Sequence, residues 1–193
     1  AQTKALLRQG FSGFLQDLNS MARSRRVRWH IVACGSRNQA FDDFIMALAS
    51  HPDAFNVLLV DAEGPVKGSP RQHLREQDNW NLAQIDDDHC QLMVQMMEAW
   101  FIADPETMSK FYGQGFRANA IPRQSNVEQI AKDTLEALLK EATRHTTKGE
   151  YHKIHHSSKL LALLDTAKVR KAAPHCNRLF VTLEQLLTRE SLH

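Results

Sequence analysis

The sequence predicts an α/β fold in which a parallel sheet is flanked by helices and the C-terminal part is helical. Residues 55–61 form an uninterrupted apolar run that ends on Asp61, and residues 89–94 form a second run of this kind. Short apolar runs bounded by turn residues are typical of strands that are buried on both faces, as in a parallel sheet. Amphipathic helical patterns lie around these runs, and strands that alternate with helices favour parallel pairing through right-handed crossovers.

The first 50 residues are expected to contribute a helix, a strand and a second helix. Residues 3–22 repeat apolar side chains at helical spacing, which predicts an amphipathic helix. Residues 27–33 are expected to form a strand that ends at Cys34-Gly35. Residues 38–50 again place apolar side chains at helical spacing, so we expect a helix there.

The middle of the chain is expected to hold a long loop between the two apolar strands. Residues 62–88 show little apolar periodicity, and loops of that length in a domain are usually functional or disordered. Residues 96–112 predict two short helices, because Asp104 is a good N-cap and Pro105 suits the first helical position. Further helices are expected at residues 126–144, 155–165 and 175–189.

Two carboxylates follow the first apolar strand, at Asp61 and Glu63. Ligands of open α/β sheets bind beyond the carboxyl ends of the strands. Oxygen ligands at such a place suit Mg²⁺ or Mn²⁺, which keeps part of its water shell. The sequence leaves a second interpretation open, in which Asp61 only ends the strand and caps the next turn.

A third acid, Glu98, stands in a strongly apolar block. A carboxylate among such neighbours must be paired, bind a metal or be protonated. Glu98 could equally lie at the polar edge of an amphipathic turn. Trp100 and Phe101 belong to the same continuous apolar segment, so we expect both to be core residues and not a platform for stacking bases.

Four segments of the sequence are similar to a known family. These are VDAEGPV, MVQMMEAWFIADPE, Tyr151-His152-Lys153, and the Pro174-x-Cys176-x-Arg178-Leu179-Phe180 stretch. Over nearly the whole chain they resemble the bacterial domain of unknown function 4276. That family is itself similar to the TOPRIM nuclease and primase fold, and it is often encoded among anti-phage defence genes, including beside ATPases.

The resemblance implies a function and a division of the chain. It implies a Mg²⁺-dependent (or Mn²⁺-dependent) nuclease with metal ligands at Asp61, Glu63 and Glu98, acting on DNA or RNA beside an ATPase partner. Lys153 and Glu98 would be the catalytic residues, with Lys153 stabilising charge on the phosphate. Residues 1–112 would be the TOPRIM-like core, without the family's usual first strand and its Glu, and residues 113–193 a helical part packed on that core.

Composition and charge agree with a cytoplasmic globular protein. The 193 residues are 42% hydrophobic, and no apolar stretch approaches the roughly 18 residues of a membrane span. Three well-separated cysteines predict reduced, buried thiols. The net charge of +2 conceals an acidic centre, since residues 61–106 carry ten acids against three bases, whereas residues 1–30 carry six bases against one acid. Such segregation suits an enzyme that acts on a phosphate backbone, although solvated helices would give the same balance.

Other functional classes find less support in the sequence. Gly113-Gln114-Gly115 lacks the Lys-Ser/Thr of a phosphate loop, and no Gly-x-Ser-x-Gly elbow occurs. His152, His155 and His156 could share a helical face and bind a transition metal, but no carboxylate or cysteine matches their spacing. The main alternative to a nuclease is a non-catalytic TOPRIM-like subunit, regulator or toxin that docks on an ATPase.

Overall fold

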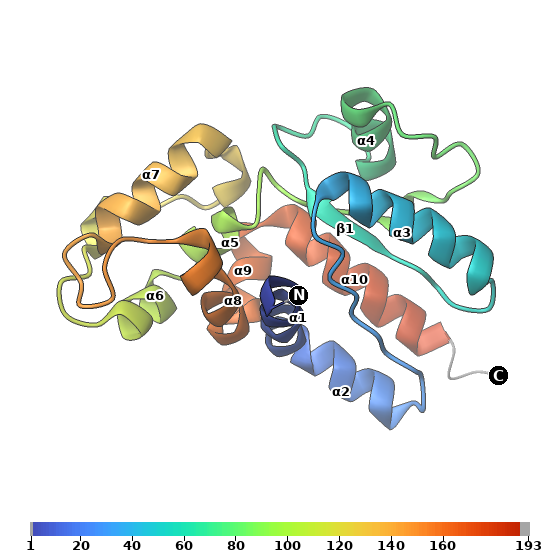
Figure 1. The fold of residues 1–193 in the computed structure, drawn as a ribbon, viewed down its shortest axis with the longest axis horizontal. Helices are drawn as coiled ribbons and strands as arrows, with labels where there is room; N and C mark the ends of the chain where they lie inside the picture. Colours follow the sequence, from blue (N-terminus) through green and yellow to red (C-terminus); the bar gives the residue numbers. More distant parts are fainter. Residues whose placement is uncertain (1, 190–193) are drawn as a thin grey trace.

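Two parallel strands form the sheet of the protein in the computed structural model, which describes residues 2–189 (Figure 1). β1 (Leu58–Asp61) pairs with β2 (Cys90–Met93), with Leu58 opposite Cys90 and Asp61 opposite Met93. The predicted parallel pairing of these two segments is therefore confirmed. The register also brings the carboxyl ends of both strands to the same edge, where Asp61 lies.

Helices make up most of the rest of the chain, and the predicted helical character of the last third is confirmed. They are α1 (Gln2–Phe14), α2 (Gln16–Ser24), α3 (Arg37–Ser50), α4 (Pro70–Asp78), α5 (Glu98–Ile102), α6 (Pro105–Tyr112), α7 (Lys132–Thr143), α8 (Lys153–Leu163), α9 (Thr166–Ala172) and α10 (Pro174–Arg189). The class is thus α/β, with a small parallel sheet flanked by helices.

The sheet is covered on both faces, because side chains of a strand alternate between them. Leu58, Val60 and Leu92 face a cluster that includes Phe44 of α3 and Leu74 of α4. The other face belongs to a larger cluster, to which Met93 and several side chains of α10 contribute. The sheet therefore lies between α3 and α4 on one side and α10 on the other (Figure 1).

The larger cluster joins segments that are far apart in the sequence. Trp100 of α5 is fully buried and stacks on Phe14 of α1, with ring centroids 4.9 Å apart. The Phe14 ring also meets the edge of Phe180 of α10, at 5.7 Å. Phe101 is fully buried as well, so the predicted core role of Trp100 and Phe101 is confirmed. Helices α1 and α10, from the two halves of the chain, thus pack together beside α5. The predicted division of the chain into two parts after residue 112 stays a prediction.

Two glycines let α1 pack closely against α8. A Cβ atom on Gly10 would lie 2.7 Å from the carbonyl oxygen of Ser158, and one on Gly13 would lie 2.8 Å from the Cβ of Ala162. Real Cβ atoms do not approach other atoms so closely, so any larger residue would push the two helices apart. This contact holds α8, and the Lys153 at its start, against the N-terminal part.

The predicted strand over residues 27–33 is wrong. This segment is extended, with Val27, Trp29 and Ile31 packed against the core and Val32 74% exposed. That alternation is what the sequence pattern indicates. A strand also needs a neighbour to accept and donate its backbone hydrogen bonds, and none of the described residues pairs with this segment.

The predicted loop over residues 62–88 is also wrong, because it contains α4. Ser69 caps this helix by accepting a hydrogen bond from the backbone N–H of Gln72, and Pro70 follows at the first helical position. Asn79 ends it in the left-handed conformation, with φ of 57°. Leu74 is the helix's one fully buried leucine, so capping residues, and not apolar periodicity, carry the signal here.

Other boundaries differ in smaller ways. The N-terminal helix is divided at Leu15 into α1 and α2, α7 begins only at Lys132, and α9 is an additional helix. Cys34, Cys90 and Cys176 are free, as expected, but only Cys90 and Cys176 are buried, whereas Cys34 is partly exposed. None of the helices within residues 2–189 is long and apolar enough to cross a membrane.

Candidate functional site

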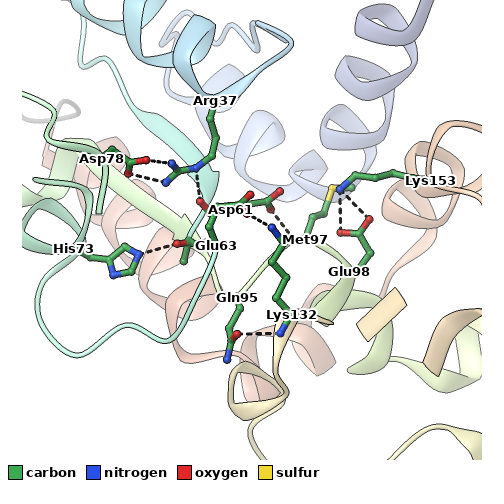
Figure 2. A network of polar contacts seen from close by, with 11 residues as sticks. Arg37, Asp61, Glu63, His73, Asp78, Gln95, Met97, Glu98, Lys132 and Lys153 are labelled. Carbon is green, nitrogen blue, oxygen red and sulfur yellow. Dashed lines mark hydrogen bonds and ion pairs between the residues drawn. The ribbon is translucent and has the colours of Figure 1, made fainter. Parts of the chain in front are cut away.

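Asp61 lies at the carboxyl end of β1 and is held by its backbone and its side chain (Figure 2). Its carbonyl oxygen accepts a hydrogen bond from Nε of Arg37 at 2.8 Å, and Arg37 also pairs with Asp78 of α4. Its Oδ1 accepts the backbone N–H of Met97 at 2.8 Å. The strand end, α3, α4 and the start of α5 are thus linked around one carboxylate.

The carboxyl of Asp61 is costly to ionise. Its pKa is raised to about 6, chiefly by burial and also by the charges of Glu98 and Glu63, while Lys153 and the Met97 N–H partly oppose the rise. Few hydrogen-bond donors and positive charges offset the cost of ionising this carboxyl. Any cation that approaches it would therefore stabilise its ionised form, because an opposite charge favours ionisation. Asp61 therefore has the electrostatic properties of a cation ligand.

Glu98, the first residue of α5, has a side chain that is only 1% exposed. Its Oε1 accepts a hydrogen bond from the hydroxyl of Tyr151 at 2.9 Å. Nζ of Lys153 lies 3.1 Å from the same oxygen and 3.4 Å from Oε2. The structure thus brings together the predicted site residues Glu98 and Lys153, and the buried carboxylate is paired as its apolar setting requires.

Lys153 connects the buried acids to solvent. It begins α8, and its side chain is 53% exposed although its ammonium contacts the buried Glu98. Burial lowers the pKa of Lys153, but the charges of Glu98 and Asp61 outweigh that effect and raise the pKa overall. The ammonium is therefore charged at neutral pH and lies between the buried Glu98 and solvent.

Glu63 faces a different partner. Its φ of 65° is left-handed, and its backbone N–H donates to the carbonyl oxygen of Gln95 at 2.8 Å. Its carboxylate forms an ion pair with Lys132 at the start of α7, whose backbone N–H donates to Oε1 of Gln95 at 3.0 Å. Asp61, Glu98 and, more weakly, Glu63 thus share the field of Lys153, while Glu63 also forms its own ion pair with Lys132 (Figure 2).

The donor chemistry of the cluster fits a hard divalent cation in part. Carboxylate oxygens are the ligands that Mg²⁺ and Mn²⁺ prefer, and Mg²⁺ often takes only one or two of them while retaining water. No group of three or more His, Cys, Asp or Glu side chains among residues 2–189 is arranged as a ready ligand set. Asp61, Glu98 and Glu63 could therefore supply part of a shell, and metal binding by them stays a prediction.

Two other candidates have structural roles. Asp104 caps α6 by accepting the backbone N–H of Thr107 at 3.2 Å, as the sequence predicts. The Nδ1 atom of His156 lies 3.0 Å from the Tyr112 hydroxyl and accepts the backbone N–H of His152 at 3.2 Å. That nitrogen is used within the fold, and the three neighbouring histidines do not form a metal-binding group within residues 2–189.

Several residues at the site are not evident from the sequence. Lys132 and Arg37 lie far along the chain from the acids that they contact, Gln95 lies far from the Lys132 N–H that it accepts, and no local pattern marks them. Tyr151 is part of the Tyr-His-Lys motif, but its hydroxyl contact with Glu98 depends on the packing of α8 against α5. Helix starts supply two of these partners, because Arg37 begins α3 and Lys132 begins α7.

The chain belongs to a family described as a domain of unknown function (DUF4276), whose model matches residues 1–184. The resemblance drawn from the sequence motifs is therefore confirmed. No curated protein and no solved structure matches the chain.

Proposed function

We propose that this member of the family is a TOPRIM-like, Mg²⁺- or Mn²⁺-dependent nuclease that hydrolyses phosphodiester bonds at the Asp61–Glu98–Lys153 cluster. One observation supports this function above others. Two acids that share the field of a half-exposed lysine lie where the parallel strands end, which is where ligands of such sheets bind.

The residues divide the task between them. Asp61, Glu98 and Glu63 would hold the metal, which supplies a nucleophilic hydroxide and neutralises phosphate charge when bound. Lys153 would donate its ammonium to a phosphate oxygen, since it is charged and reaches from solvent to the acids. Tyr151 would fix the orientation of Glu98 through its 2.9 Å hydrogen bond.

The biological setting of the proposal rests on the family resemblance. A cytoplasmic anti-phage defence complex would contain this chain as the nuclease and an ATPase as its partner. The chain has no phosphate loop of its own, so ATP hydrolysis would be the work of that partner.

The alternative is a non-catalytic subunit that docks on the ATPase, acting as a regulator or a toxin. Two ion pairs favour it. Glu63 is paired with Lys132 and Glu98 with Lys153, so two of the three proposed ligands already have a cationic partner. In a scaffold protein these pairs would serve only to join α7 and α8 to the sheet edge.

Cleavage of labelled DNA and RNA in the presence of Mg²⁺ or Mn²⁺ tests the proposal. We expect Asp61→Asn and Lys153→Met each to lower the rate about 100-fold or more, as loss of a charge-stabilising group does. Asp104→Asn is the matched control, because it also removes a buried carboxylate but one with a structural role. Equal activity of wild type and Asp61→Asn, or no metal-dependent cleavage by the wild type with its ATPase present, would favour the non-catalytic alternative.

A further inference from the structure

The exposed side of α8 carries a stripe of bases that the proposed active site does not use. His152, His155 and Lys159 follow one another at intervals of three and four residues, so they lie on one side of the helix. All three are exposed. The rings of His152 and His155 lie 4.4 Å apart, centroid to centroid.

Lys148 joins this stripe from the turn between α7 and α8. Its Nζ lies 5.2 Å from the centre of the Phe111 ring, which in turn contacts the ring of His156 at 6.0 Å. Burial lowers the pKa of His156, and the stripe lowers it further, through the charges of His152, His155, Lys159 and Lys148. The four side chains thus lie close enough to His156 for all of their charges to lower its pKa.

Their charges are not compensated within the fold. Across residues 2–189, none of these four side chains takes part in an ion pair. Glu136, which feels the charges of His152 and Lys153, is paired with Lys140 at 2.8 Å. A surface of free lysines and imidazoles, with one phenylalanine beside it, suits a chain of phosphates that carries bases able to stack.

The stripe begins beside the residue that contacts the acidic cluster. Lys153, whose Nζ lies 3.1 Å from Oε1 of Glu98, is the neighbour of His152 in the same first turn of α8. We propose that Lys148, His152, His155 and Lys159 bind the phosphate backbone of a nucleic-acid strand and guide it to Lys153. The guiding role rests on the nuclease function proposed above, whereas the binding role does not.

The full-length chain and a fluorescently labelled single-stranded oligonucleotide test the binding role by anisotropy over a range of salt concentrations. The double variant Lys148→Ala/Lys159→Ala removes two phosphate contacts and should weaken binding about 20-fold at 0.1 M salt. The slope of the logarithm of the binding constant against the logarithm of the salt concentration should become shallower by about 1.4, since each phosphate contact on a single strand contributes roughly 0.7 to that slope. The control Arg23→Ala/Lys171→Ala removes two exposed charges from α2 and α9 and should bind like the wild type.

Three results with the oligonucleotide alone would overturn the binding proposal. They are no binding of the oligonucleotide by the wild type, equal losses in the two double variants, and wild-type affinity in the Lys148→Ala/Lys159→Ala protein. Polyglutamate and vesicles containing phosphatidylserine serve as competing polyanions. If either displaces the oligonucleotide at an equal concentration of charge, the surface is a general polyanion or membrane site and the proposal fails.

A second assay separates this proposal from the nuclease function. Asp61→Asn should keep full oligonucleotide affinity but lose cleavage, whereas Lys148→Ala/Lys159→Ala should cleave a small chromogenic phosphodiester normally and a long strand poorly. If the wild type binds through the stripe but cleaves nothing, the binding role stands and the nuclease proposal fails. If the stripe variant cleaves long strands at the wild-type rate, the guiding role is wrong.

Discussion

The two ends of α5 hold buried acids with opposite electrostatic properties. Beyond its C-terminal end, Asp104 is fully buried, yet its pKa is lowered. Burial alone would raise that pKa, but its carboxylate accepts the N–H groups of Thr107 and Asp165 and lies 3.4 Å from Nζ of Lys168. The two N–H donors and the lysine thus stabilise the ionised form of this acid despite its burial.

At the N-terminal end of α5, Asp61 has the higher pKa, about 6, chiefly because of burial. Its side chain has one backbone donor, Met97, and it shares the charge of Lys153 with Glu98. Burial acts to raise the pKa of both acids, so burial alone does not distinguish an acid proposed to bind a cation from one that caps a helix. The two acids differ in how many hydrogen-bond donors and positive charges surround the carboxylate. An acid with few such partners is the one that an external cation would stabilise.

Trp100→Ala should disturb the surroundings of both acids, because α5 lies between the backbone N–H that binds Asp61 and the Asp104 carboxylate. Trp100 is fully buried against Phe14, and its truncation should cost about 3–5 kcal/mol in the free energy of unfolding. Urea denaturation measures this loss. The control Ile154→Ala changes a side chain that is 55% exposed and should stay within about 0.5 kcal/mol. A Trp100→Ala protein as stable as the control would show that the core is assigned wrongly.

Asp61→Asn should stabilise the protein without metal. Because the folded-state pKa is raised from 3.8 to about 6, the wild type loses stability as the pH rises through that window. The variant avoids this loss, so its advantage should be absent below pH about 4 and reach about 3 kcal/mol above pH about 6, at about 1.4 kcal/mol per pKa unit. Thermal unfolding between these limits measures the difference. A variant less stable than the wild type at neutral pH would contradict the assignment.

Asp104→Asn should have the opposite and smaller effect. An amide can still cap α6, but it loses the charge that strengthens the bonds from Asp165 and Lys168, so we expect a loss of about 1 kcal/mol. The folded-state pKa of Asp104 is lowered, so its stabilisation is present above the unfolded value and disappears in acid. Thermal unfolding over the same pH range should therefore show the variant to be less stable than the wild type at neutral pH only. A deficit that persists in acid would mean that packing, and not charge, is responsible.

The sequence predicts much of the region around α5. The two strands, the cap at Asp104 and the buried Trp100 follow from local patterns, since an apolar run, an Asp-Pro pair and a continuous apolar block each act over a few residues. The segment at 27–33 fails for the converse reason. Its pattern describes which side chains face the core, but pairing depends on a neighbouring strand that local sequence does not reveal.

The partners of the candidate site are less predictable. Glu98 and Lys153 are 55 residues apart, and the family resemblance rather than any spacing relates them. Lys132 is 69 residues from Glu63, and its role depends on where α7 begins, which the apolar pattern misplaces. Charged side chains at helix starts can be identified from sequence, but the acid that each one reaches is decided by tertiary packing.

The pKa of the Asp61 carboxyl, followed by NMR with and without Mg²⁺, tests the account most directly. In metal-free buffer the carboxyl should titrate at about 6, because burial opposes its charge and one N–H does not offset that cost. Saturating Mg²⁺ should lower the pKa clearly, since a bound cation favours the ionised form. A carboxyl that titrates near its ordinary value of 3.8, or whose pKa is unchanged by Mg²⁺, would contradict the proposal that Asp61 binds a divalent cation.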